Sequence, residues 1–156
     1  MQKINFMKIP AKLLSTLIIA SLFSFYAFKG NDIPWDITQL VYPADLAKTL
    51  NDASAKKPVI ICVGAVDLIK TAVKTEHPAS TLAGIEYLKY ILSKHGKDKE
   101  IIIYCGCCKL KTCPNIKPAF EYALEAGFKN AKVLYIPTHL SDDWIDKGYP
   151  MEPLTN

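Results

Sequence analysis

Ile101-Ile102-Ile103-Tyr104-Cys105 is followed at once by a cysteine-rich segment, Gly106 to Asn115. Three β-branched residues and a tyrosine in a row are typical of a central parallel strand that is buried on both faces. The segment from Lys117 to Ala126 has a helical pattern, which Gly127 closes. The sequence therefore predicts a strand, a loop and a helix, with Cys105 at the carboxyl end of the strand. In open α/β sheets, ligands bind at that end.

Cysteine is concentrated in this loop. Four of the five cysteines of the chain lie within nine residues. A thiolate is the reactive form of cysteine, and backbone N–H groups, a helix N-terminus and nearby lysines all lower a thiol pKa. We therefore expect Cys105, which the end of the strand holds in place, to be the catalytic cysteine. The expected active-site loop consists of Gly106, Cys107, Cys108, Lys109, Leu110, Lys111, Thr112 and Cys113.

The other segments alternate between strand and helix patterns. Cys62 lies inside one expected strand, where a free cysteine packs as a small hydrophobic residue. Strands that alternate with helices predict a parallel sheet covered on both faces. The expected strands are Val59 to Val63, a brief strand at Ala72-Val73, and Ala131 to Ile136, and the expected helices are Tyr42 to Leu50, Leu82 to His95, and Leu140 to Lys147.

Charge is distributed unevenly along the chain. The net charge of +4 comes from four lysines in the first 30 residues, which contain no acidic residue. From Asn31 onward, 15 lysines balance 15 acidic residues, and the chain contains no arginine. The net positive charge therefore comes from the N-terminal segment, and we expect no nucleic-acid partner.

Residues 1–30 have the pattern of a targeting segment. A lysine-rich start precedes an uncharged, apolar run of sixteen residues, Leu13 to Phe28. This run is shorter than the roughly 20 residues of a membrane span. A cleaved signal peptide and an uncleaved membrane anchor formed by residues 13–28 both remain open. We expect an exported protein, periplasmic or otherwise extracytoplasmic, that contacts the membrane only through this segment, and a folded domain over residues 31–156.

Three stretches together are similar to the rhodanese (sulfurtransferase) family. The first is the strand that ends in Cys105, the second is the helix, Gly-Phe turn and strand from Ala119 to Val133, and the third is Asp143 to Pro150, with the pattern W-x-x-x-G-Y-P. The resemblance extends over residues 38 to 152. It implies a rhodanese-like three-layer α/β fold with a central, mainly parallel sheet of about four or five strands and helices on both faces.

The resemblance also implies a function. A rhodanese-like sulfurtransferase takes a sulfane sulfur from thiosulfate or a persulfide, holds it as a persulfide on Cys105, and passes it to a thiol or another nucleophilic acceptor. The partners are then a small sulfur donor and a persulfide or thiol acceptor, with no cofactor and no metal. Cys107, Cys108 and Cys113 are candidate resolving or disulfide-forming cysteines.

The chain departs from the family pattern around this site. The cysteine loop is several residues longer and contains Lys109 and Lys111 in place of arginine. The family's H-I-x-G-A segment is Leu68 to Ala72 here, without the histidine and the glycine, and the usual Gly-Gly after the fourth strand is replaced near Pro137-Thr138. A longer loop predicts a wider pocket.

Three alternatives therefore remain open for the cysteines. A structural disulfide, for example between Cys108 and Cys113, is compatible with catalysis by Cys105. The four loop cysteines are also a possible ligand set for Zn²⁺ or Cu(I), although their spacing lacks the usual C-x2-C pairs. In the third alternative, the domain is a non-catalytic binding module or a thiol-disulfide module on the same scaffold.

Overall fold

A computed structural model describes residues 33–153 of this chain. The expected leader, residues 1–30, lies outside the described residues. Among the described residues, no helix is long and apolar enough to cross a membrane. The elements in chain order are η1 (Ile37–Gln39), β1 (Leu40–Val41), α2 (Pro43–Asn51), β2 (Val59–Cys62), β3 (Val73–Lys74), α3 (Leu82–Ser93), β4 (Ile101–Tyr104), η2 (Leu110–Thr112), α4 (Ile116–Glu125), β5 (Ala131–Leu134) and η3 (Ser141–Ile145).

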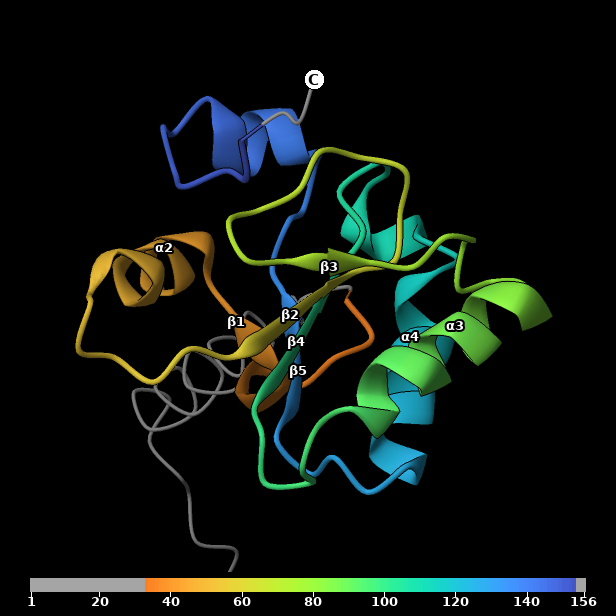
Figure 1. Ribbon diagram of the computed structural model, residues 1–156. Helices are drawn as coiled ribbons and strands as arrows, with labels where there is room; N and C mark the ends of the chain where they lie inside the picture. The colour runs from red at the N-terminus through yellow and green to blue at the C-terminus, as the bar shows by residue number, and fades with distance from the viewer. Residues whose placement is uncertain (1–32, 154–156) are drawn as a thin grey trace, which may run out of the picture. The chain divides into compact units, whose positions relative to one another are not determined.

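The five strands form one sheet in the order β1-β5-β4-β2-β3, and every pair is parallel. β4 is the central strand, with Ile103 paired to Ile61 of β2 on one side and to Val133 of β5 on the other. Because all strands run the same way, their carboxyl ends meet at one edge of the sheet. The strand before Cys105 is therefore buried and central, as the sequence predicts (Figure 1).

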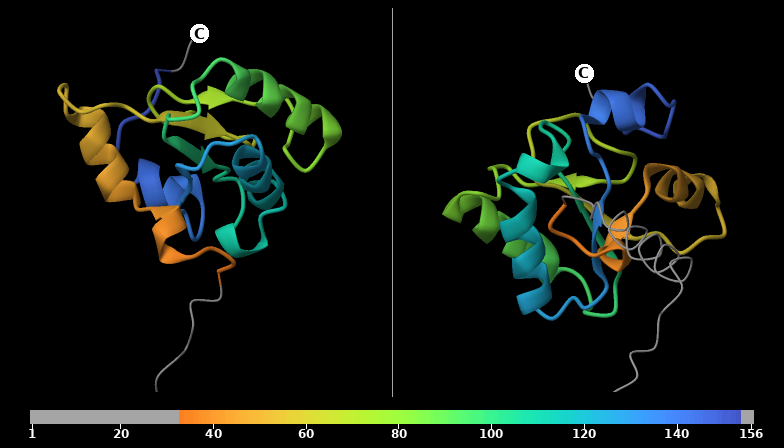
Figure 2. Two further views of the ribbon diagram at one scale, coloured as in Figure 1. Left: turned by 90° about the horizontal axis from the view of Figure 1, so that it is seen from below. Right: turned by 180° about the vertical axis from the view of Figure 1, so that it is seen from behind.

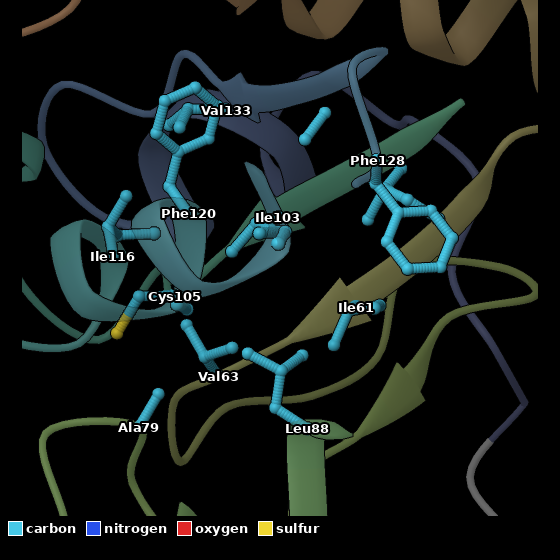
Figure 3. Packing of buried hydrophobic residues seen from close by; sticks show 14 of the residues in the cluster. Ile61, Val63, Ala79, Leu88, Ile103, Cys105, Ile116, Phe120, Phe128 and Val133 are labelled. Carbon is cyan, nitrogen blue, oxygen red and sulfur yellow. The ribbon is translucent and has the colours of Figure 1, made fainter. Parts of the chain in front are cut away.

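Helices cover both faces of the sheet (Figure 2). Alternate residues of each strand point to opposite faces. Ile61, Ile103 and Val133 pack in one hydrophobic cluster with α3 and α4, and this cluster also contains Cys105 (Figure 3). Ile60 and Ile102 pack in a second cluster with α2 and with Trp144 of η3. The three-layer α/β fold expected from the resemblance is confirmed.

Several details differ from the sequence prediction. β1 was not expected, because its two residues are too few to show an alternation of apolar and polar side chains. The last helix is a short π-helix, Ser141–Ile145, and does not extend from Leu140 to Lys147. On α4, Phe120 and Ala123 are buried as expected, whereas Leu124 remains 38% exposed.

The C-terminal segment packs back onto the loop that follows β2. The Trp144 ring is fully buried, and its Nε1–H donates to the Pro150 carbonyl at 3.1 Å. Ile69 and Met151 form an antiparallel bridge, and the Glu152 N–H donates to the Leu68 carbonyl at 2.8 Å. The closing W-x-x-x-G-Y-P pattern thus fixes one of the loops at the carboxyl edge of the sheet.

Candidate active site

Three loops meet at the carboxyl edge of the sheet: residues 63–72 after β2, 105–115 after β4 and 135–140 after β5. Cys105 directly follows β4, and the pairing of that strand continues to its end, where the Val63 N–H donates to the Tyr104 carbonyl at 2.8 Å. Cys105 is only 2% exposed and lies with Val63, Ala79 and Ile116 in the same hydrophobic cluster (Figure 3). The strand therefore holds Cys105 in a fixed and buried position.

Two glycines allow neighbouring backbone segments to approach one another closely around Cys105. A Cβ on Gly64 would lie 2.6 Å from the Cys105 Sγ and 2.7 Å from the Cys105 carbonyl oxygen. Gly106 has a φ of +75°, and a Cβ there would lie 2.8 Å from the Cβ of Leu140. The Leu140 N–H also donates to the Gly106 carbonyl at 2.9 Å. The loop after β4 is thus turned sharply and tied to the loop after β5.

The turn brings four sulfur atoms together. The Sγ atoms of Cys105 and Cys107 are 3.1 Å apart, and those of Cys107 and Cys108 are 3.9 Å apart. All three of these sulfurs lie within 4.8 Å of one another. The 3-10 turn η2 returns the chain so that the Cys113 thiol is hydrogen-bonded to both Cys105 and Cys108. All five cysteines lie in the described part of the chain, and none of them forms a disulfide.

Hydrogen-bond donors surround these sulfurs. The Asn115 Nδ2 donates to the Cys105 Sγ at 3.6 Å, and the N–H of Cys107 also donates to this sulfur. The Cys107 sulfur accepts from the N–H of Ala65. The Cys113 sulfur accepts from the N–H groups of Asn115 and Ile116, at the start of α4. The helix N-terminus thus acts on Cys113, whereas the sequence analysis assigned it to Cys105.

The thiol pKa values follow this arrangement. The hydrogen bond from Cys105, reinforced by the two N–H groups at the start of α4, lowers the pKa of Cys113. The same hydrogen bond, together with burial, raises the pKa of Cys105 far above its usual range. Burial raises the pKa of Cys107, and it raises the pKa of Cys108 to about 11. The expectation of a lowered pKa at Cys105 is therefore wrong for the resting site, where the lowered thiol pKa is that of Cys113.

An open groove lies on the outer side of the cluster. It has a volume of about 450 Å³ and runs between the loops after β2, β4 and β5. Cys107 is exposed and lines this groove, whereas Cys105 lies behind it. The remaining lining residues are Ala65, Val66, Asp67, Gly106, His139, Leu140, Ser141 and Ile145.

The rest of the predicted loop has a structural role. Leu110 is buried and lines a small cavity beside the sulfurs. The Thr112 hydroxyl donates to the Lys109 carbonyl at 3.4 Å within the η2 turn. Lys109 and Lys111 are exposed and are not among the residues that line the groove. The ionisable side chains of the groove are instead Asp67 and His139, and the His139 Nδ1 lies 3.5 Å from the Asp142 carboxylate.

The sequence analysis did not identify Gly64 and Asn115 as site residues. Asn115 occupies the cap position of α4, but its side chain makes no capping hydrogen bond. It is 6% exposed and accepts the Ser80 N–H at 3.1 Å while donating to Cys105. Gly64, two residues after the end of β2, could have been found from the rule that a glycine near a strand end permits close backbone approach.

No protein-family model and no curated protein matches this chain. Among solved structures, the chain is similar to a cysteine-to-serine variant of EanB in complex with hercynine, with 21% identity and a TM-score of 0.51 over 74% of this chain. It is also similar to a threonine-to-valine variant of EanB in complex with hercynine, with 20% identity and a TM-score of 0.52 over 80% of this chain. The chain spans 28% and 29% of the length of these two EanB chains.

A third solved structure covers nearly the whole chain. It is the solution structure of the homodimeric polysulfide-sulfur transferase from Wolinella succinogenes, with 17% identity, a TM-score of 0.47 and 90% coverage of both chains. At such identities, the likeness to EanB concerns the fold and not the chemistry. The parallel strand order and the two helical layers show a three-layer α/β fold, which is consistent with the rhodanese-like fold that the resemblance implies.

Proposed function

We propose that this domain is a sulfurtransferase that carries a sulfane sulfur as a persulfide on Cys105. The observation that carries the proposal is the 3.1 Å separation between the Sγ atoms of Cys105 and Cys107. Cys107 is exposed in the groove, and Cys105 is buried directly behind it. The pair therefore offers one sulfur to a donor in solution and a second sulfur that is protected from solvent.

The first step takes place in the groove. The Cys107 thiolate attacks the outer sulfur of a small persulfide, R–S–SH, so that Cys107–S–SH forms and R–S⁻ leaves. The thiolate is the nucleophile in such an exchange, and its access to the donor is required. Cys107 is accessible to the donor, because it is the cysteine that lines the groove.

In the second step, the sulfur moves inward. The Cys105 sulfur attacks the outer sulfur of Cys107–S–SH, while the Cys113 thiolate accepts the Cys105 proton. The products are Cys105–S–SH, the Cys107 thiolate and the Cys113 thiol, so that atoms and charge balance. The hydrogen bond between Cys105 and Cys113 supports this proton transfer, because a general base must lie within hydrogen-bond reach of its proton. An acceptor thiol takes the sulfur by the reverse route.

The groove favours a persulfide over thiosulfate as donor. Thiosulfate is a dianion, and its recognition requires cationic groups or converging N–H groups. The two loop lysines do not line the groove, whereas the carboxylate of Asp67 does. The leader pattern of residues 1–30 supports action outside the cytoplasm, with a small persulfide as donor and a thiol as acceptor.

Single-turnover loading tests the proposal. The reduced protein is mixed with a persulfide whose outer sulfur is isotopically labelled, alkylated, digested and analysed by mass spectrometry. We expect the label on Cys105 in the wild type and in Cys62→Ala, which removes the cysteine outside the cluster. In Cys105→Ser, we expect the label to remain on Cys107, because a serine hydroxyl cannot hold a sulfane sulfur.

In Cys107→Ser, loading of Cys105 should be at least about tenfold slower, because one transfer step loses its nucleophile. Circular dichroism checks that each variant retains the fold. The proposal is wrong if Cys105→Ser delivers sulfur to an acceptor thiol at the wild-type rate, or if the label accumulates on Cys113.

A further inference from the structure

Three of the four clustered sulfurs also line a small cavity. Cys105, Cys108 and Cys113 line a cavity of about 10 Å³, together with apolar side chains such as Leu110 and Ile136. A void of this size accommodates about one small atom. Cys107 lies outside this cavity lining, but its Sγ is within 4.8 Å of those of Cys105 and Cys108. Three soft ligand atoms thus line a space of about one atom, and a fourth lies beside two of them.

The surroundings suit deprotonated sulfur at this place. Backbone N–H groups point at Cys105, Cys107 and Cys113, and the Asn115 amide donates to Cys105. Such hydrogen bonds stabilise negative charge on sulfur, and the groups around metal ligands orient them in the same way. The cavity is lined by sulfur and apolar carbon, without a carboxylate or an imidazole among its described lining residues. Hard cations, which require oxygen ligands, therefore find no partner here.

We propose that Cys105, Cys107, Cys108 and Cys113 bind one thiophilic d¹⁰ metal ion, Zn²⁺ or Cu(I). Thiolate ligands select these ions over harder ones, and four thiolates make a closed tetrahedral site for Zn²⁺. The irregular spacing of the cysteines in the sequence does not exclude such a site, because η2 returns Cys113 to the other three.

Two of the sulfur–sulfur distances are close to those of a tetrahedral site. With a Zn–S bond of about 2.3 Å, tetrahedral geometry places the sulfurs about 3.8 Å apart. The Cys107 and Cys108 sulfurs are already 3.9 Å apart. The Cys105 and Cys107 sulfurs are 3.1 Å apart, so that Cys107 has to withdraw by less than about 1 Å to reach that spacing. Cys107 is exposed on a loop, where such a shift meets little resistance.

The inference does not rest on the proposed function, because metal binding is measured without any sulfur transfer. The two uses of the site exclude each other at any moment, since a metal ion engages the sulfurs that a persulfide requires. A chain that binds the ion but never carries a labelled sulfur would overturn the proposed function and leave this inference standing. A chain that carries the sulfur but binds neither ion would do the reverse.

The experiment is an anaerobic titration of the reduced full-length protein. One arm adds Zn²⁺ in competition with a chromophoric zinc chelator, and the other adds Cu(I) in competition with a chromophoric Cu(I) chelator. We expect one equivalent to bind in at least one arm, with affinity lowered at least about tenfold in Cys108→Ser and in Cys113→Ser. Cys62→Ala, which removes a cysteine outside the cluster, should bind as the wild type does.

A second measurement uses the wild type alone and so does not depend on the folding of variants. The bound ion should slow alkylation of Cys107 and Cys108 at least about tenfold, because a coordinated thiolate is not free to react. The inference is overturned if the protein binds less than one equivalent of Zn²⁺ and less than one equivalent of Cu(I). It is also overturned if Cys62→Ala weakens binding as much as Cys113→Ser does, or if alkylation of Cys107 and Cys108 proceeds unchanged in the presence of the ion.

Discussion

Asn115 connects two loops of the site through one buried amide. Its Oδ1 accepts the Ser80 N–H, and its Nδ2 donates to the Cys105 sulfur. It occupies the cap position of α4 but has a right-handed helical backbone, so its side chain turns away from the helix and toward the cysteine. Asn115 is therefore a positioning residue for Cys105.

Asn115→Ala and Asn115→Asp separate the two roles of this amide. Aspartate retains an acceptor for the Ser80 N–H but has no donor for the thiolate, and its negative charge opposes ionisation of a nearby thiol. We expect the pH–rate profile of persulfide loading to move to higher pH in both variants, and further in Asn115→Asp. Asn115→Ala should also lower stability by about 1–3 kcal/mol, because the Ser80 N–H loses its partner.

Loading kinetics across pH and urea unfolding provide the two measurements. A purely structural role would change the unfolding midpoint and leave the pH–rate profile where it is in the wild type. That outcome would contradict the assignment of Asn115 as a positioning residue.

For single residues, the sequence predicts the position of Cys105 at the end of a strand but not the side chains that surround it. The buried run of β4 fixes the position of the cysteine, and this was readable from residue types alone. The direction of the sulfurs of Cys107 and Cys113 depends on the positive φ of Gly106 and on its hydrogen bond to Leu140. The contact between Gly106 and Leu140 joins residues that are far apart in the sequence and leaves no local pattern, so the arrangement of the sulfurs was not predictable.

The segment between β2 and β3 contains a strained residue. Thr71 has a φ of +66°, in the left-handed region that β-branched residues rarely adopt. It lies where the H-I-x-G-A pattern of the rhodanese family has glycine. The Thr71 N–H donates to the Glu152 carboxylate at 2.8 Å, and the C-terminal segment holds the neighbouring residues in place. The surrounding contacts therefore maintain a backbone conformation that the side chain opposes.

Thr71→Gly should raise the free energy of unfolding by about 1 kcal/mol, because the relief of left-handed strain exceeds the added backbone entropy of glycine. Thr71→Asn should give a smaller gain, since asparagine tolerates this region. Gly106→Ala is the opposite control and should destabilise the domain, because it adds a Cβ at positive φ against Leu140. Urea unfolding measures all three, and a Thr71→Gly variant less stable than the wild type would contradict the argument.

Element length decided which parts of the fold were predictable. The helices α2, α3 and α4 and the strands β2, β4 and β5 have enough residues to show a period, and they lie within a few residues of their expected positions. β1 has two residues and exists because Leu40 and Val41 pair with β5. Such an element is defined by its partner and not by its own sequence, so it could not be predicted.

For the whole molecule, the alternation of strands and helices was sufficient to predict the layers. The Asp143 to Pro150 motif, which supported the resemblance, proves to be structural: Trp144 packs against the Tyr149 ring at 5.2 Å in the hydrophobic layer beside α2. The motif thus indicates the fold, and Ile145 is its residue on the groove. This is why the sequence predicts the architecture more fully than the substrate.

The thiols are buried to different extents, so their alkylation rates report which parts of the domain open. Cys62 is fully buried, Cys105 and Cys113 are 2% and 7% exposed, and Cys107 is exposed on the groove. In the metal-free protein, Cys107 should be alkylated without any opening, whereas Cys105 should require separation of the loops and Cys62 disruption of the sheet. Time courses of alkylation followed by peptide mass spectrometry would therefore distinguish local from global unfolding in one sample without introduced labels. Equal rates at Cys105 and Cys62 would show instead that the site opens only when the whole domain unfolds.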